Sequence, residues 1–260
     1  MLHLLGPVQA VGRATLRSVF AVGRAGYLAA DAVRALRKWG MWLPHLTDEL
    51  VRIGVASVPI ALFIAGFTGI VMAIQASYTL TGAVPAYFVG AMVGKTMIVE
   101  LGPVLTGLSL SGRVGANIAA EIGTMRVTEQ IDALETLAYD PVAYLVVPRV
   151  LAGAIMFPMV VTLASAMGVA AGWGTSLVLL DMSSPTFLRG LRLLFEPWDV
   201  QFSLIKSVTF GVAVTGIGCA FGFHTRGGAE GVGRAATRAV VVGSMAILVL
   251  DAFWAAVLLN

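Results

Sequence analysis

Long apolar runs with almost no charge constrain this chain more than any other feature of it. They cover residues 51–77, 86–112, 145–180, 201–223 and 239–259. A helix needs about 20 apolar residues to cross a bilayer, and helices satisfy their own backbone groups inside lipid. Only 12% of the residues are charged, about half the share found in soluble domains. We therefore predict an all-α integral membrane protein, a single domain over 1–260, with these five runs as transmembrane helices.

The segment before the first run has a different pattern. Over residues 7–38, apolar side chains recur near one face of a helix, and Arg13, Arg17 and Arg24 form a basic stripe on another. A basic amphipathic helix is typical of a segment that lies in the membrane surface, with its cations toward lipid head groups. We expect an interfacial helix within 1–45; the alternative is an ordinary soluble helix face.

The distribution of lysine and arginine predicts the orientation. Seven of them lie in the N-terminal segment up to Arg52, and three each occur at 113–149 and 224–238. The opposite side has none at 78–85 and two at 181–200. Because positive residues stay on the cytoplasmic side, we expect a cytoplasmic N-terminus and an external C-terminus.

Two glycine-containing stretches superficially resemble nucleotide-binding motifs. The stretch GAMVGKT at 90–96 has three residues between its glycines instead of four and lies inside a predicted span, so we interpret Gly90 and Gly94 as a helix contact. The stretch GGAEGVG follows no strand, so we interpret 224–238 as a flexible cytoplasmic loop. The histidines have no cysteine or carboxylate at metal-ligand spacing, and no catalytic set is evident. The sequence therefore predicts neither enzymatic activity nor a metal site.

Three charged residues fall inside the predicted spans. Glu100, Lys206 and Asp251 would each cost about 2.5–3.5 kcal/mol to insert, so such residues face the protein interior or water and usually pair. We predict a buried cluster of one lysine with two carboxylates, and expect Lys95 to face elsewhere. The cluster could be a purely structural ion pair or a polar element of a transport path.

A polar helix separates the second and third spans. In TMRVTEQIDALETL, residues 124–137, Thr128 is placed to cap a helix, and Val127, Ile131 and Leu134 form a narrow apolar stripe. We predict a helix over 121–138, closed by the Asp-Pro pair at 140–141. Its free face is acidic, whereas a helix on anionic lipid favours lysine and arginine. The pattern therefore favours a docking surface for a protein with basic groups.

The same region carries a family resemblance. The run ELGPVLTGLSLSGRVGANIAAEIGTMRVTEQIDALETLAYDPVAYLVVPR, residues 100–149, closely resembles the MlaE/YrbE permeases, the membrane subunits of ABC lipid transporters that work with MCE proteins. Residues 231–260 resemble the end of that family. The resemblance implies a homodimer in the bacterial inner membrane, with a periplasmic C-terminus and a phospholipid substrate. It also implies a periplasmic MCE-domain partner and a separate ATPase that holds ATP and Mg, with no cofactor in this chain and no nucleic-acid partner.

The resemblance also assigns site residues. The substrate-binding set comprises Gln75, Tyr78, Leu80, Glu100, Lys206 and Asp251. The ATPase-coupling set comprises Glu121, Arg126, Glu129, Gln130, Asp132 and Glu135. Some members carry arginine where this chain has Val99, so one cation fewer lies beside Glu100. From the residues alone, two other classes stay open: an ion-coupled secondary transporter that uses the intramembrane carboxylates, and a membrane scaffold that transports nothing.

Overall fold

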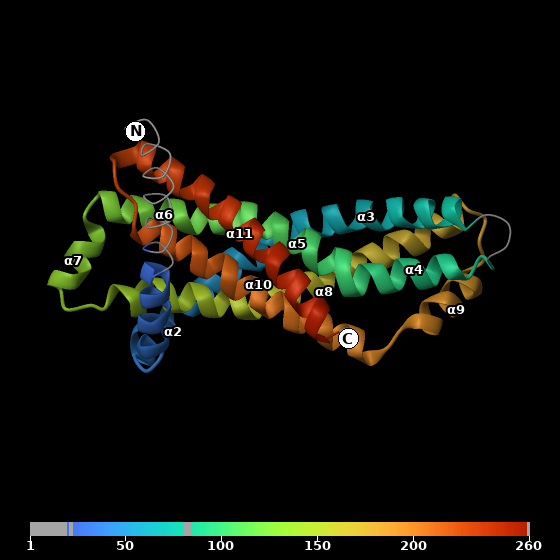
Figure 1. Cartoon of the computed structure of the whole chain (residues 1–260), viewed down its shortest axis with the longest axis horizontal. Coiled ribbons are helices and arrows are strands. Elements are labelled where there is room, and N and C mark those ends of the chain that lie inside the picture. The colour runs from blue at the N-terminus through green and yellow to red at the C-terminus, as the bar shows by residue number, and fades with distance from the viewer. Residues whose placement is uncertain (1–19, 21–22, 81–84, 259–260) are drawn as a thin grey trace, which may run out of the picture.

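The computed structural model describes residues 20, 23–80 and 85–258, and its helices run mostly along one long axis (Figure 1). Of the predicted helix over 7–38, the part up to residue 22 lies almost wholly outside the described residues, and so do residues 81–84 between the first two predicted spans. Where the predicted interfacial segment is described, residues 23–35 are helical and run across the long axis (Figure 1). A turn at residues 36–38 separates them from the first apolar helices.

Among the described residues, five helical stretches are long and apolar enough to cross a membrane, which agrees with the predicted number of spans. The first two are segmented, and short π-helical turns interrupt the second. Their bounds are α2 (Trp39–Ile53) with α3 (Val58–Thr79), then α4 (Phe88–Thr96), α5 (Gly102–Leu110) and α6 (Ala116–Val127) in line, α8 (Val147–Val178), α10 (Pro197–Phe223) and α11 (Gly228–Leu258). The third span is one long helix, as its length indicated.

Besides the helical residues 23–35, two short helices in the described part of the chain lie between spans, at opposite ends of the molecule. They are α7 (Gln130–Thr136) and α9 (Ser184–Leu194). Figure 1 shows α7 at the end that carries the N-terminal segment and the start of α11, and α9 at the other end. The segments with many positive residues therefore gather at one end of the bundle, as the predicted topology requires.

The predicted loop over 224–238 is mostly wrong. The connection is only the four residues before Gly228, and α11 continues as helix through the glycine-rich stretch. Glu230 and Arg234 form an ion pair one turn apart, which stabilises a helix. A Cβ on Gly231 would lie 2.0 Å from the carbonyl oxygen of Arg226, so this glycine permits a close approach of two backbones.

The polar segment is two helices where the sequence predicts one. Helix α6 continues the second span to Val127, and α7 begins only after Glu129, whose φ of 60° breaks the helix. Thr128 does not cap α7: its hydroxyl donates to the carbonyl of Thr124 at 2.8 Å. Hydrogen bonding back into the preceding turn is a common alternative for threonine. The result is an elbow at Thr128 and Glu129.

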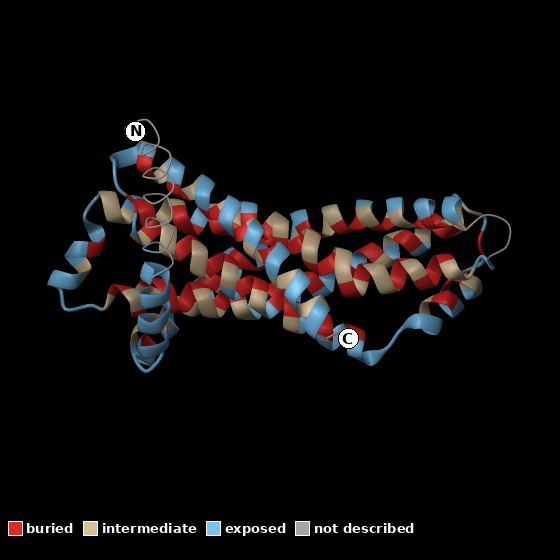
Figure 2. Ribbon diagram, viewed as in Figure 1, coloured by how far each residue is buried: buried red, intermediate tan, exposed pale blue. Residues whose placement is uncertain are grey.

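Small residues permit a close contact between α3 and α8. A Cβ on Gly69 would lie 1.9 Å from the carbonyl oxygen of Gly168, and a Cβ on Gly172 would lie 3.1 Å from the carbonyl oxygen of Gly69. Such glycines let two membrane helices approach to backbone distance. In Figure 2, buried residues follow the inward sides of the long helices, while α7 is largely exposed.

The close contact between Gly69 and Gly168 leads to a prediction about the stability of the protein. Gly69→Ala should destabilise the protein by about 1–3 kcal/mol, since the added methyl group meets backbone that cannot rotate away. The control is Gly66→Ala on the same helix, where the new Cβ would lie 3.4 Å from the flexible end of Met167. Unfolding of both variants in detergent micelles checks this. Equal stability of the two would contradict the assigned contact.

Candidate functional site

The three intramembrane charges form one cluster, as predicted. Lys206 on α10 is fully buried, and its Nζ lies 2.8 Å from Oε2 of Glu100 and contacts Oδ1 of Asp251 on α11. The side chain of Asp251 is 14% exposed and that of Glu100 is 41% exposed. The lysine is thus sealed inside the bundle, whereas one of its carboxylates reaches the surface of the chain.

A proline shapes this cluster. Pro103 has no N–H, so it cannot donate to the carbonyl of Val99 four residues earlier. The backbone at Met97–Leu101 forms a π-helical turn, and Nζ of Lys206 donates to the Val99 carbonyl at 3.3 Å. Turns of this kind are frequent at functional sites. The lysine therefore joins the irregular part of the second span to two other spans.

The other three predicted substrate residues lie at the end of α3, away from the cluster. Gln75 and Tyr78 are exposed, and Tyr78 reaches 80% exposure. Leu80 is half-buried and lines a small cavity of about 460 Å³ between the end of α3 and the start of α9. The six predicted substrate residues therefore occupy two levels of the structure and do not form one pocket within this chain.

Lys95 faces away from Glu100, as expected, and has a partner that the sequence analysis missed. Its Nζ lies 2.7 Å from Oδ1 of Asp199, at the start of α10. The other oxygen of Asp199 accepts the backbone N–H of Glu196 at 3.0 Å, in a capping box. The sequence did contain a signal for this helix start: Glu196 and Asp199 lie on either side of Pro197. A helix often starts at a proline, and its first turn favours acidic residues.

The predicted coupling residues divide into an exposed group and a half-buried group. Glu129, Gln130 and Glu135 are exposed on the elbow and α7. Asp132 is also exposed, but its Oδ1 lies 2.5 Å from Nη1 of Arg126, across the elbow. The acidic face is therefore partly neutralised by its own arginine, which fixes the angle between α6 and α7.

Glu121 belongs to an internal ion-pair network. Its Oε1 lies 3.1 Å from Nη2 of Arg149 and 3.1 Å from Nη1 of Arg52. Arg149 also lies 3.3 Å from Glu49, and its side chain is only 5% exposed. Arg149 and Glu49 were not identified from the sequence as site residues. The network joins α2, α6 and α8 just below the elbow.

Asp140 stabilises the segment that follows α7. Its carboxylate accepts the N–H of Val142 at 2.9 Å and of Ala143 at 3.3 Å, and Nζ of Lys38 lies 2.8 Å away. Partial burial opposes ionisation, but the hydrogen bonds from Lys38 and the two N–H groups outweigh it and lower the pKa of Asp140. The ionised form is therefore the one that stabilises this loop.

Asp140 makes stability depend on pH. Because its pKa is lower in the folded chain than in the unfolded chain, its contribution is complete above the unfolded value and disappears as the pH falls through the folded value. Asp140→Ala should cost about 1 kcal/mol at pH 7 and progressively less below about pH 4. Thermal unfolding in micelles at both pH values checks this. Glu135→Ala, which removes an exposed carboxylate, should show no such change.

These features define a polytopic α-helical membrane protein with charged networks between its spans and an exposed polar elbow at one end. Comparison with known proteins gives the family. The family model described as Permease MlaE matches residues 46–257, and the chain belongs to this family.

Several curated relatives match almost the whole chain. A protein of Haemophilus influenzae named intermembrane phospholipid transport system permease protein MlaE is 34% identical over 94% of both chains. A probable ABC transporter permease protein of Rickettsia bellii is 39% identical over 95% of both chains. Another probable ABC transporter permease protein, from Synechocystis, is 42% identical over 79% of this chain and 78% of its own.

Proposed function

We propose that this chain is the permease subunit of an ABC-type transporter that moves phospholipid between the inner membrane and a periplasmic MCE-domain carrier. The observation that carries the proposal is similarity over nearly the full length to a permease named for phospholipid transport. The exposed elbow supports it, since a membrane subunit driven by a separate ATPase needs a polar contact surface outside the membrane. ATP and Mg would then be held by that ATPase.

The surface for the ATPase is the elbow with α7. Glu129, Gln130 and Glu135 are exposed there, and α7 lies at the extreme end of the molecule (Figure 1). Below it, Glu121 contacts Arg149 of α8 and Arg52 of α2. A push on the elbow would therefore act on three helices at once. In this proposal Glu129, Gln130 and Glu135 contact the partner, Arg126 and Asp132 hold the elbow angle, and Glu121 passes the movement inward.

The substrate path uses the charged cluster and the outer end of α3. Phospholipid carries both an apolar and a charged part, and the exposed end of α3 offers Gln75 and Tyr78 beside apolar surface. Glu100 reaches the chain surface while its partner Lys206 stays buried. We place the periplasmic MCE-domain carrier at this end, opposite the elbow.

The chain would work as a homodimer. Helix α11 is the least buried of the five spans, and several of its apolar side chains, among them Met245, Val249 and Phe253, are more than half exposed. A helix that presents so much apolar surface faces either lipid or a second copy. With five spans, the two ends of the chain lie on opposite sides, and the basic segments at the elbow end favour a cytoplasmic N-terminus and a periplasmic C-terminus.

We do not propose an ion-coupled secondary transporter. Its carboxylates would have to bind and release an ion, yet Glu100 and Asp251 both contact the ammonium group of Lys206. No observation on the described residues favours this class over the permease.

The test is lipid transfer by the whole complex. The chain, the ATPase and the MCE-domain protein are reconstituted in liposomes with labelled phospholipid. Transfer should require ATP, and the chain alone should hydrolyse none. Glu129→Lys or Glu135→Lys should lower transfer about tenfold or more, as lost interface charge pairs do. The matched control is Asp48→Lys, which reverses an exposed carboxylate outside the elbow.

Asp132 is not a suitable position for charge reversal in this test, because its reversal would also break the pair with Arg126 and alter the elbow itself. Transfer that proceeds without ATP would contradict the function. Full activity of both lysine variants would contradict the assignment of the elbow as the ATPase contact.

A further inference from the structure

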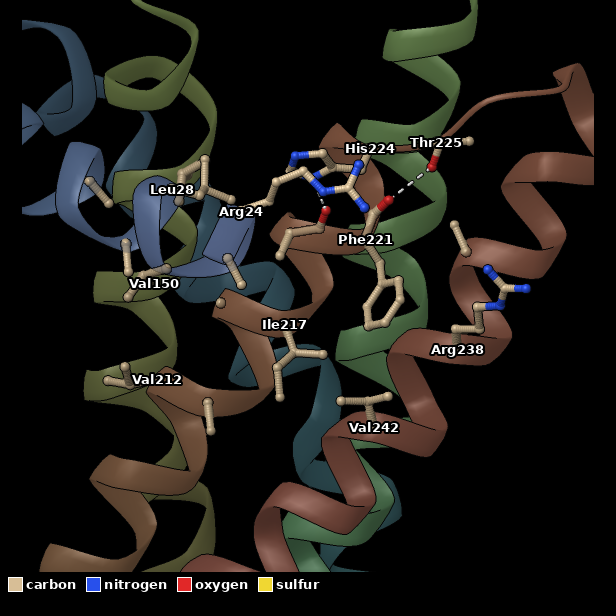
Figure 3. A pocket seen from close by; sticks show the side chains of 18 of the residues that line it. Arg24, Leu28, Val150, Val212, Ile217, Phe221, His224, Thr225, Arg238 and Val242 are labelled. Atoms are coloured by element: carbon tan, nitrogen blue, oxygen red, sulfur yellow. Dashed lines mark hydrogen bonds between the residues drawn. The ribbon is translucent and has the colours of Figure 1, made fainter. Parts of the chain in front are cut away.

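A large cavity lies at the elbow end of the molecule, separate from the charged cluster and from the ATPase contact. It has a volume of about 1170 Å³ and is lined by Phe20, residues 24–36, α8, α10, α11 and the connection between the last two (Figure 3). Small-molecule pockets are typically about 300–1,000 Å³, so this one is somewhat larger than that class. It is far from the end of α3, which carries Gln75 and Tyr78 and lies at the opposite end of the long axis (Figure 1).

The cavity wall changes from polar to apolar with depth. Near the connection between α10 and α11 it presents Arg24 and His224, and deeper it presents Val212 and Val242, with Arg238 one helical turn before Val242 (Figure 3). Val212 precedes His224 by twelve residues on the same helix, about 18 Å at a rise of about 1.5 Å per residue. One leaflet of the hydrocarbon core is about 15 Å deep. The wall therefore matches the profile of a single lipid molecule, with head group and acyl chains.

The arginines that line the cavity have few partners in the protein. Arg24, Arg226 and Arg238 line the cavity, and among the described residues none of them makes an ion pair. The residues outside the described part contain no aspartate or glutamate side chain. Arg234, also in the lining, pairs with Glu230. A cluster of arginines above an apolar slot attracts an anion, and the guanidinium fork fits phosphate oxygens.

We propose that this cavity binds one anionic phospholipid of the surrounding leaflet, distinct from the transported lipid. Its phosphate would contact Arg24 and Arg226 at the polar end, and its acyl chains would lie along Val212, Ile217 and Val242. The lipid would fill the space between the N-terminal helical segment and the spans. The proposal goes beyond the transport function, and it uses the proposed orientation only to assign the leaflet as the cytoplasmic one.

Photochemical labelling tests the site directly. The full-length chain is placed in vesicles that contain either phosphatidylglycerol or phosphatidylcholine with the same photoreactive acyl chain, and labelled peptides are mapped by mass spectrometry. Without any nucleotide, phosphatidylglycerol should label the stretch from Val212 to Val242, and phosphatidylcholine should label it about fivefold less or weaker still.

Gly216 offers a variant that fills the cavity without disturbing the fold. This residue lines the cavity, and a Cβ placed on it would meet no atom within 4 Å. Gly216→Leu should therefore lower labelling about tenfold, since a change of about 1.4 kcal/mol in binding free energy has that effect. The control is Gly174→Leu on α8, where the added Cβ also meets nothing and which does not line the cavity.

The binding of the lipid head group is tested by removing single positive charges from the cavity lining. Arg24→Gln and Arg226→Gln should each lower phosphatidylglycerol labelling about fivefold, the effect of removing one cation near an anionic lipid. Arg37→Gln, an exposed arginine outside the cavity lining, should change nothing. Equal labelling by both lipids, or unchanged labelling of Gly216→Leu, would overturn the proposal. Cross-links between two copies of the chain at these residues would overturn it too, because a second copy would then be the occupant. ATP-driven transfer is a separate measurement, so each proposal can fail without the other.

Discussion

Lys206→Met should destabilise the protein by about 3–5 kcal/mol. Methionine is about as long as lysine, but it lacks the positive charge that Glu100 and Asp251 contact. Removing one partner of a buried ion pair costs about this much free energy. It also leaves the carbonyl of Val99 without the ammonium donor. Unfolding in detergent micelles measures the loss. A cost under about 1 kcal/mol would contradict a buried cluster, since it would mean the carboxylates are solvated.

A triple variant separates the structural role of the cluster from its role in transport. Lys206→Met with Glu100→Gln and Asp251→Asn removes all the charges together, and uncharged replacements of buried ion pairs are often close to neutral in stability. We therefore expect the triple variant to regain most of the stability. If it also transfers lipid at the rate of the unmodified complex, the cluster is a structural connection only. A stable triple variant without transfer would place the cluster in the transport path.

The spans could be predicted because the bilayer imposes a simple rule. Every buried backbone group must be satisfied within its own helix, so length and hydrophobicity alone identify the five spans. The cluster at Lys206 could be predicted for a related reason. A charge in mid-membrane is too costly to leave unpaired, so one lysine and two carboxylates in different spans are enough to indicate a contact.

Local geometry at the ends of the spans could not be predicted in this way. Glycine marks both flexible loops and close helix contacts, so the composition of the stretch before Arg234 favours a loop although the stretch is helix. Glu129 adopts a left-handed conformation that its residue type rarely favours, and it breaks a helix that a regular apolar stripe predicts. Tertiary packing decides these positions.

The second charged network could not be predicted for a similar reason. Arg149 and Glu49 lie near the ends of apolar helices, where charges ordinarily reach water and cost little. Only the packing of α2, α6 and α8 shows that Arg149 is buried and shared between two glutamates. A count of positive residues by segment uses Arg149 only as an indicator of orientation. The same arginine also connects helices of the bundle.

Arg149→Met should destabilise the protein by about 3 kcal/mol, because it leaves Glu49 and Glu121 side by side. Arg52 lowers the cost: it lies 3.1 Å from Glu121 and 3.7 Å from Glu49, although its own side chain is 58% exposed. Adding Glu49→Gln should recover a large part of the loss, since the remaining Glu121 keeps Arg52. Arg52→Met is the matched control and should cost about 1 kcal/mol or less, as exposed ion pairs do.

The same pair of variants tests whether the network transmits movement from the elbow. If Arg149 only holds helices together, the rescued variant Arg149→Met with Glu49→Gln should transfer lipid at nearly the unmodified rate. If it links α6 to α8 during the cycle, the rescued variant should be stable and still hydrolyse ATP in the complex, yet transfer little lipid. Loss of ATPase activity in step with transfer would contradict this linking role, because it would place the defect in assembly with the ATPase.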